Sequence, residues 1–363
     1  MDDCLKAAHS VEEATRLVQQ LSKLLERGGF RLGKWLTTHD TVLESVSEPS
    51  SVQSNASFVL NDKTTHHVLG MTWDVKSDRF ALGVTVKEKP CSRRGILSML
   101  SALFDPLGFV APVSLLAKII LQNLCRKGIG WDESIPEVDR EAWLKWVADL
   151  PALSRLRMPR CITPCTALTN CSVCLHHFSD ASMTGYGTVT YLRVVTEDKK
   201  VHCSFMFAKA RLTPIKSVSI PRLELMAACL AVQVDAFIRC ETDFLYCNSV
   251  FWTDSTSVLQ MIRNTSTRYP VFVANRLTKI EQGSSPTQWR YVDSKRNIAD
   301  HVSRGMSAAD IISASRWFKG PEFLYLEEEN CLRRRFTSPI CLRNFWHCIV
   351  ENSRYRRYRL RVS

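Results

Sequence analysis

The sequence has no hydrophobic run long enough to cross a bilayer, and no signal peptide opens it. Its best apolar run, residues 109–121, is too short for a membrane span and carries Lys118. These absences exclude a helical membrane span. They favour an intracellular protein, cytoplasmic or particle-associated, with the nucleus as an alternative compartment. In such a compartment the fourteen cysteines are expected to be mostly reduced, buried thiols.

A convincing zinc site is also lacking. The tightest cysteine group is Cys161, Cys165, Cys171 and Cys174, whose spacing only loosely imitates a zinc motif. Cys174 falls inside a predicted strand, so buried thiols are the favoured interpretation and zinc binding is the minor alternative.

Acidic residues are scarce near the C-terminus, where the basic character of the chain concentrates. The formal net charge is +12, which suits a polyanionic partner. From residue 333 onward Glu351 is the only acid. The same stretch contains nine arginines: Arg333, Arg334, Arg335, Arg343, Arg354, Arg356, Arg357, Arg359 and Arg361. Such clusters are more often solvated tails than readers of nucleic-acid sequence. Residues 326–363 are therefore predicted to be a disordered basic tail.

The first half of the chain is predicted to be largely helical. Ser10 and Glu13 have the spacing of a capping box, followed by a helix over residues 11–27 with one apolar stripe. A strand is expected over 30–36, and a hairpin from strands at 67–74 and 80–86. Three further helices are expected at residues 93–104, 113–126 and 139–150. Residues 151–170 are polar and contain three prolines, which is typical of a linker.

The second half alternates strand and helix patterns. Strands are expected at 174–180, 186–194, 201–208, 250–253 and 288–292. Helices are expected at 221–239, 255–263, 271–282 and 308–318. Three consecutive antiparallel strands followed by alternating elements predict an α/β (α+β) fold, with a mixed five-stranded sheet flanked by helices.

Four acids of this half occupy similar positions. Asp180 and Asp254 end predicted strands, Asp300 follows the last strand, and Glu224 lies in the first turn of the long helix. Each has an ordinary alternative: a turn acid, a helix N-cap, an exposed loop acid, or an acid favoured by the helix dipole. The helix-dipole alternative explains Glu224 least well, because the helix face of Glu224 also carries Ala227, Ala228 and Ala231. Burying a carboxylate on such a face is costly without a cation.

These acids could converge at one edge of a single sheet. Carboxylates held close together need a counter-charge, and hard oxygen ligands favour Mg²⁺ or Mn²⁺. Two such ions about 4 Å apart form a site that cleaves phosphodiesters.

Four short motifs carry a resemblance to a known family. They are Phe-Ser-Asp-Ala-Ser at 178–182, Pro-Arg-Leu-Glu-Leu at 221–225, Trp-Thr-Asp-Ser at 252–255, and Arg-Asn-Ile-Ala-Asp-His-Val-Ser-Arg at 296–304. In this order they resemble the ribonuclease H domain of LTR retrotransposons. The stretch from Gly95 to Pro112, which contains Phe-Asp-Pro-Leu-Gly, resembles the Pao/BEL class of pol polyproteins.

The resemblance implies a domain order. Residues 1–91 would be the C-terminal part of a truncated reverse-transcriptase palm, 92–150 a helical thumb or connection, 151–170 the linker, and 171–325 a ribonuclease H-like domain. Met1-Asp2-Asp3 resembles the end of a Tyr-x-Asp-Asp hairpin, so Asp2 and Asp3 would be vestigial polymerase metal ligands. With the fingers and most of the palm missing, polymerase activity is not expected.

The resemblance also implies a function. Asp180, Glu224, Asp254 and Asp300 would be the catalytic residues and would bind two Mg²⁺ (or Mn²⁺) ions. The enzyme would cleave the RNA strand of RNA–DNA hybrids, leaving a 3′-hydroxyl and a 5′-phosphate. The expected partners are the hybrid, other nucleic acid, and the rest of the pol polyprotein.

One departure and two alternatives accompany this hypothesis. Many cellular ribonucleases H carry a histidine before the last aspartate, and residues 292–299 contain none, which leaves His301 as a candidate helper. The chain could instead be a non-catalytic nucleic-acid-binding remnant. A Pao family label could also say peptidase, but the stretches after Asp180 and Asp254 lack the glycine of an aspartic-protease loop.

Overall fold

The computed structural model describes residues 8, 10–30, 35–45, 65–68, 71–84, 86, 88–163, 171–242, 247–264 and 266–326. Asp2, Asp3 and Cys165 lie outside these residues, as does the predicted tail beyond Leu326. The expectations for them therefore stay predictions.

The N-terminal helices follow the capping pattern of the sequence. Helix α1 (Val11–Arg27) begins after Ser10, whose Oγ accepts a hydrogen bond from the Glu13 N–H at 3.2 Å, as predicted. No residue of α1 is buried, and the short α2 (Asp40–Glu44) follows it. The strand expected over 30–36 falls partly outside the described residues.

A small antiparallel sheet joins two distant parts of the chain. Its order is β1 (Thr65–Val68), β2 (Met71–Asp74), β3 (Arg79–Ala81) and β4 (Arg157–Pro159). Strand β4 and the 3₁₀ helix η1 (Leu150–Arg155) occupy the first part of the expected linker. The linker prediction differs from the structure here because Met158 pairs with Phe80 and both side chains are buried.

Helices α3 (Arg93–Ala102), α4 (Ala111–Arg126) and α5 (Glu137–Asp149) form close to the expected positions. They do not stand apart from the following domain. The Leu107 carbonyl accepts from the Ala208 N–H at 2.9 Å, and the Phe109 carbonyl accepts from Trp317 Nε1 at 2.8 Å. One hydrophobic core runs from Met71 to Leu324, so the helices and the larger sheet are packed as one body.

The larger sheet is the predicted mixed sheet of five strands. Its order is β7 (Val201–Leu212), β6 (Gly185–Val195), β5 (Ser172–Ala181), β8 (Asn248–Thr253) and β9 (Trp289–Tyr291). Strands β5, β6 and β7 run antiparallel, whereas β8 pairs parallel with β5 and β9 parallel with β8. Every residue of β5 is buried, since helices cover both faces of the sheet.

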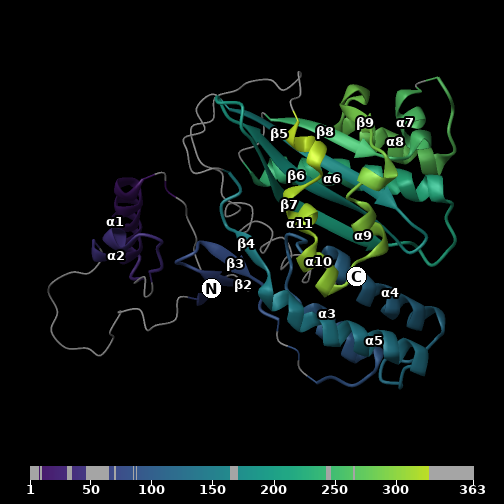
Figure 1. Ribbon diagram of the computed structural model, residues 1–363, viewed down its shortest axis with the longest axis horizontal. Helices are drawn as coiled ribbons and strands as arrows, with labels where there is room; N and C mark the ends of the chain where they lie inside the picture. The colour runs from purple at the N-terminus through teal and green to yellow at the C-terminus, as the bar shows by residue number, and fades with distance from the viewer. Residues whose placement is uncertain are drawn as a thin grey trace.

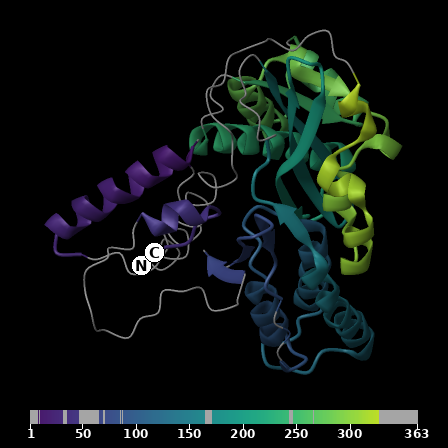
Figure 2. The same cartoon turned by 60° about the vertical axis from the view of Figure 1, so that its left-hand side comes forward.

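Helix α6 (Ile220–Glu241) packs on β5 and β6, and α7 (Thr256–Arg263) and α8 (Val271–Gly283) pack against α6. The other face carries α4, α9 (Asp300–Arg304) and α11 (Ser315–Lys319), and α10 (Ala308–Ser313), which follows α9 in the chain, packs against η1 (Figures 1 and 2). Short 3₁₀ turns lie at η3 (Pro286–Gln288), η4 (Ser294–Arg296) and η5 (Glu322–Tyr325). The helix expected over 308–318 divides at Ala314, and the sequence did not predict α9.

Within the described ranges, no helix combines the length and the apolar character that a membrane crossing requires.

Candidate metal centre

The two strand-end aspartates are brought together by parallel pairing. Strands β5 and β8 are hydrogen-bonded neighbours, and their last paired residues are Ser179 and Thr253. Asp180 and Asp254 each follow one of these residues. Since parallel strands end at the same edge of a sheet, both carboxylates reach the same place.

Glu224 reaches this edge because its helix packs closely on the sheet. Ala227, Ala228 and Ala231 are fully buried, as the alanine face of the sequence predicted. Three turns further along the same face, the buried Asp235 accepts a hydrogen bond from His177 Nε2 of β5 at 3.0 Å. The small face and this polar anchor fix α6 on the sheet, and thereby place Glu224.

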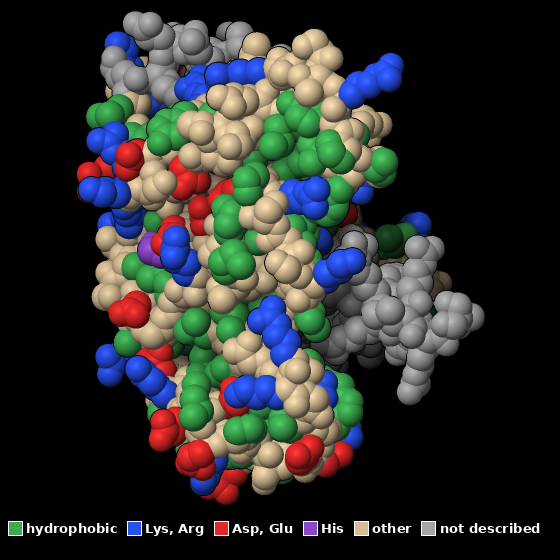
Figure 3. All heavy atoms as spheres, turned by 90° about the vertical axis from the view of Figure 1, so that its right-hand side faces the viewer, with side chains coloured by type: hydrophobic (Ala, Val, Ile, Leu, Met, Phe, Trp, Pro, Cys, Tyr) green, Lys and Arg blue, Asp and Glu red, His purple; other side chains and the backbone are tan. Residues whose placement is uncertain are grey.

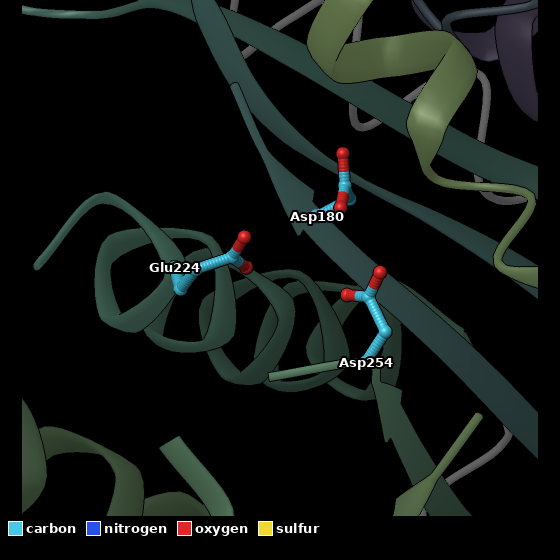
Figure 4. Close-up of side chains that lie close together, drawn as sticks. All are labelled: Asp180, Glu224 and Asp254. Atoms are coloured by element: carbon cyan, nitrogen blue, oxygen red, sulfur yellow. The ribbon is translucent and has the colours of Figure 1, made fainter. Parts of the chain in front are cut away.

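Asp180, Glu224 and Asp254 form one carboxylate group. Each offers an oxygen atom, and these atoms lie within 4.8 Å of one another. Figure 4 shows the two aspartates at the strand ends and Glu224 on the helix, with all three carboxylates directed toward a shared space. Among the described residues, this is the one group of three or more His, Cys, Asp or Glu side chains close enough to share a metal ion.

Burial and mutual repulsion make this group electrostatically unfavourable when it is ionised. Burial raises the pKa of Glu224 to about 9, and the charges of Asp180 and Asp254 add to the effect. Burial also raises the pKa of Asp180 to about 7, although the Ser303 hydroxyl, which donates to Asp180 Oδ2, acts in the opposite direction. Glu224 Oε2 is buried, and the described residues offer it no hydrogen-bond partner.

These features fit a divalent cation. A buried carboxylate oxygen without a partner is costly, and a cation beside it would supply the missing partner. The donors are all hard carboxylate oxygens, which suits Mg²⁺ or Mn²⁺ better than softer metals.

Asp300 and His301 lie beside this group rather than in it. Asp300 is the first residue of α9, and its Oδ1 accepts a charge-assisted hydrogen bond from Arg304 Nε. It is close enough to raise the pKa of Asp180. The half-buried ring of His301 packs edge-on against Trp317 at 6.1 Å between ring centroids, and burial lowers the pKa of His301. The roles predicted for these two residues stay predictions.

Sequence reasoning missed three polar residues that contact the carboxylates. Ser303 donates to Asp180, while Ser294 Oγ and Asn297 Nδ2 donate to Asp254 at 2.6 and 3.2 Å. Asn297 and Ser303 belong to the motif at 296–304, where only Asp300 and His301 were singled out. Membership of that motif was the only feature of the sequence that could have indicated Asn297 and Ser303. Ser294 lies before the motif, and nothing in the sequence indicated its role.

The described cysteines are free thiols. Cys171 and Cys174 are buried, and Cys161 Sγ donates to the Thr163 carbonyl at 3.2 Å. The single metal-compatible group among the described residues contains no cysteine.

Residues 92–255 match the family model of the Pao retrotransposon-like RNaseH-like domain. No curated protein matches the sequence.

Solved structures with similarity include the N-terminal ribonuclease H domain of a Mycobacterium tuberculosis protein, fused to maltose-binding protein. It is 13% identical, covers 39% of this chain and 96% of its own, and has a TM-score of 0.26. Ribonuclease H1 from Halobacterium salinarum is 13% identical, covers 36% of this chain and 93% of its own, and has a TM-score of 0.23. A foamy viral protease–reverse transcriptase, in complex with double-stranded DNA, is 14% identical with a TM-score of 0.38; the match covers 63% of this chain but only 38% of that one.

The family match begins just before α3 and includes Asp180, Glu224 and Asp254, whereas Asp300 lies beyond its end. The matched range includes helices α3 to α5 as well as strands β5 to β8, which share one hydrophobic core with them. Residues 92–255 are thus similar to a retrotransposon-type, ribonuclease H-like domain of the Pao family.

Proposed function

We propose that this chain is a metal-dependent endonuclease that hydrolyses the RNA strand of RNA–DNA hybrids. The observation that supports this most strongly is the meeting of Asp180, Glu224 and Asp254 around a buried carboxylate oxygen without a partner. These acids lie in a region that matches a ribonuclease H-like family, at the positions that the motif resemblance assigns to metal ligands.

The three carboxylates would hold Mg²⁺ or Mn²⁺, with two ions as the full complement. When bound, the ions would activate a water molecule and neutralise charge on the phosphate. Hydrolysis would join the water oxygen to phosphorus and break the bond from phosphorus to the 3′-oxygen, and the proton that the water releases would be balanced by the one that the 3′-oxygen takes up. The products carry a 3′-hydroxyl and a 5′-phosphate.

Asp300 is the proposed fourth ligand. Its carboxylate is paired with Arg304, and both side chains are partly exposed. An exposed ion pair of this kind contributes roughly 0–1 kcal/mol to stability. Asp300 could therefore leave Arg304 and bind a metal ion at little cost in free energy. Arg304 would then be available to a phosphate of the substrate.

Nucleic acid is the proposed partner. The chain carries a net charge of +12. Figure 3 shows a face on which small groups of Asp and Glu side chains lie among Lys and Arg side chains. Basic side chains close to acidic ones can attract a polyanion toward an acidic centre. One of the similar structures, the ribonuclease H1 called LC11, was solved with an RNA/DNA hybrid. The foamy viral protease–reverse transcriptase was solved with double-stranded DNA. The assignments of residues 1–91 to a reverse-transcriptase palm and of residues 92–150 to a thumb or connection are also part of this proposal.

A non-catalytic nucleic-acid-binding remnant is the second candidate. The pairing of Asp300 with Arg304 favours it, because a fourth carboxylate engaged by a cationic side chain leaves three ligands for the metal.

Cleavage of a hybrid labelled on its RNA strand separates the two candidates. We expect the full-length chain to cut the RNA only with Mg²⁺ or Mn²⁺, and Asp254→Asn to lower the rate by more than about 100-fold. Asp198→Asn is the matched control, since Asp198 is an exposed turn residue paired with Lys200. Activity that survives Asp254→Asn would overturn the nuclease proposal.

A further inference from the structure

Asn297 connects the ends of the two strands that carry the aspartates. It is a buried side chain with 4% of its surface exposed. Its Nδ2 donates to the Ser179 carbonyl at 3.0 Å and to Asp254 Oδ1 at 3.2 Å, while its Oδ1 accepts from the Ala299 N–H at 3.2 Å. One amide thus contacts the backbone of β5 and the side chain that follows β8.

Asp180 is held in the sheet by its pairing with Gly187 of β6, but no strand pairing ties Asp180 to Asp254 directly. Parallel pairing between β5 and β8 ends at Ser179 and Thr253, one residue before Asp180 and Asp254. Beyond that pair, like charges on the two carboxylates favour their separation. Ser294 also donates to Asp254, but its hydroxyl contacts the other oxygen, Oδ2, and no hydrogen bond from Ser294 to β5 accompanies it among the described residues.

We propose that Asn297 is a positioning residue that fixes the Asp254 carboxylate relative to Asp180, in the arrangement that a shared divalent cation requires. This inference rests on the proposed function only in taking Asp180, Glu224 and Asp254 as ligands of that cation. Asn297 does not touch the metal or the phosphate. It acts through Asp254, in the way that residues behind metal ligands orient them.

A purely structural role makes a different prediction. If Asn297 only closes the turn between η4 and α9, its loss lowers the melting temperature without changing the affinity of the folded protein for metal. A positioning role lowers the affinity for metal in protein that is still folded.

The test is Mn²⁺ titration of the full-length chain by calorimetry, with melting temperatures recorded in EDTA. We expect Asn297→Ala to weaken Mn²⁺ binding by about 10- to 100-fold. Asn264→Ala is the matched control, because Asn264 is exposed and its amide donates to Thr267 at 2.8 Å, away from the carboxylates. Unchanged Mn²⁺ affinity in folded Asn297→Ala overturns the proposal, as does an equal loss in Asn264→Ala.

Asn297→Asp keeps the proposal testable if the alanine variant does not fold. It preserves the size of the side chain but removes both donated hydrogen bonds. Its extra negative charge would by attraction alone tighten Mn²⁺ binding, whereas loss of positioning weakens it. We expect weaker binding, and equal or tighter binding contradicts the role assigned to Asn297.

Hybrid cleavage by the same proteins distinguishes this inference from the proposed function. If the wild-type chain binds Mn²⁺ and loses affinity in the Asn297 variants but cleaves no hybrid, the nuclease proposal fails and the positioning role stands. If the wild-type chain cleaves and the Asn297 variants keep full Mn²⁺ affinity, the positioning role fails alone.

Discussion

Metal binding at this centre should be strongly coupled to pH. A metal ion binds ionised carboxylates, yet burial and neighbouring charge raise the pKa of Glu224 to about 9 and that of Asp180 to about 7. Around neutral pH the metal-free protein therefore keeps Glu224 protonated, and below pH 7 Asp180 as well. The bound cation must displace these protons.

The size of the effect follows from the two pKa values. Between about pH 7 and 9 one proton leaves per metal-bound centre, so the affinity should rise about tenfold per pH unit. Below about pH 7 two protons leave, and the rise should approach about a hundredfold per unit. In the metal-free protein, by contrast, the stability of the fold falls as the pH rises. A carboxyl whose pKa is raised by folding stabilises the protein below its unfolded pKa, and this contribution is lost as pH rises toward the folded pKa.

The assay is Mn²⁺ titration calorimetry at several pH values, in paired buffers with different ionisation enthalpies. The buffer dependence of the heat counts the protons released. Glu224→Gln is the control variant: it has no proton to lose, so its affinity should be weaker and nearly flat between about pH 7.5 and 9. An affinity of the wild-type chain that is constant from pH 6 to 8, with no proton release, would refute the reasoning.

Two further predictions concern the stability of the fold around the metal centre. A Cβ at Gly108 would lie 1.9 Å from the Ala208 carbonyl oxygen at φ +80°, so Gly108→Ala should cost more than about 2 kcal/mol in urea unfolding. Gly128→Ala, at φ +73° with nothing within 4 Å, should cost about 1 kcal/mol, and equal costs would contradict this account. Asp235→Ala leaves the buried His177 without its acceptor and should destabilise the protein by about 3 kcal/mol in the same assay; a loss below about 1 kcal/mol would contradict its anchoring role.

The parts of the fold and site that the sequence predicted depend on local patterns. The β-rich runs, the proline in the first turn of α6 and the alternation of strand with helix indicated the mixed sheet. The alanine face of α6 indicated that Glu224 would be carried close to the sheet. Asp180 and Asp254 were singled out because each ends a predicted strand and because the motifs around them resemble those of a ribonuclease H domain.

What the sequence did not predict depends on contacts between distant residues. Strand β4 forms because Met158 packs against Phe80, and Arg160 Nη2 donates to Asp78 Oδ2 at 2.8 Å, 82 residues earlier in the chain. Asn297 contacts Ser179 across 118 residues. Neither contact leaves a periodic or compositional signal in the sequence. For this reason residues 157–159 were predicted to be part of a linker, although they form a strand.

The most direct test of the central claim is the anomalous scattering of Mn²⁺ in crystals of the full-length chain. We expect an anomalous peak bound by oxygens of Asp180, Glu224 and Asp254, and loss of that peak in Asp254→Asn. Crystals grown above pH 8 in Mn²⁺ that show no peak among these three carboxylates would contradict it.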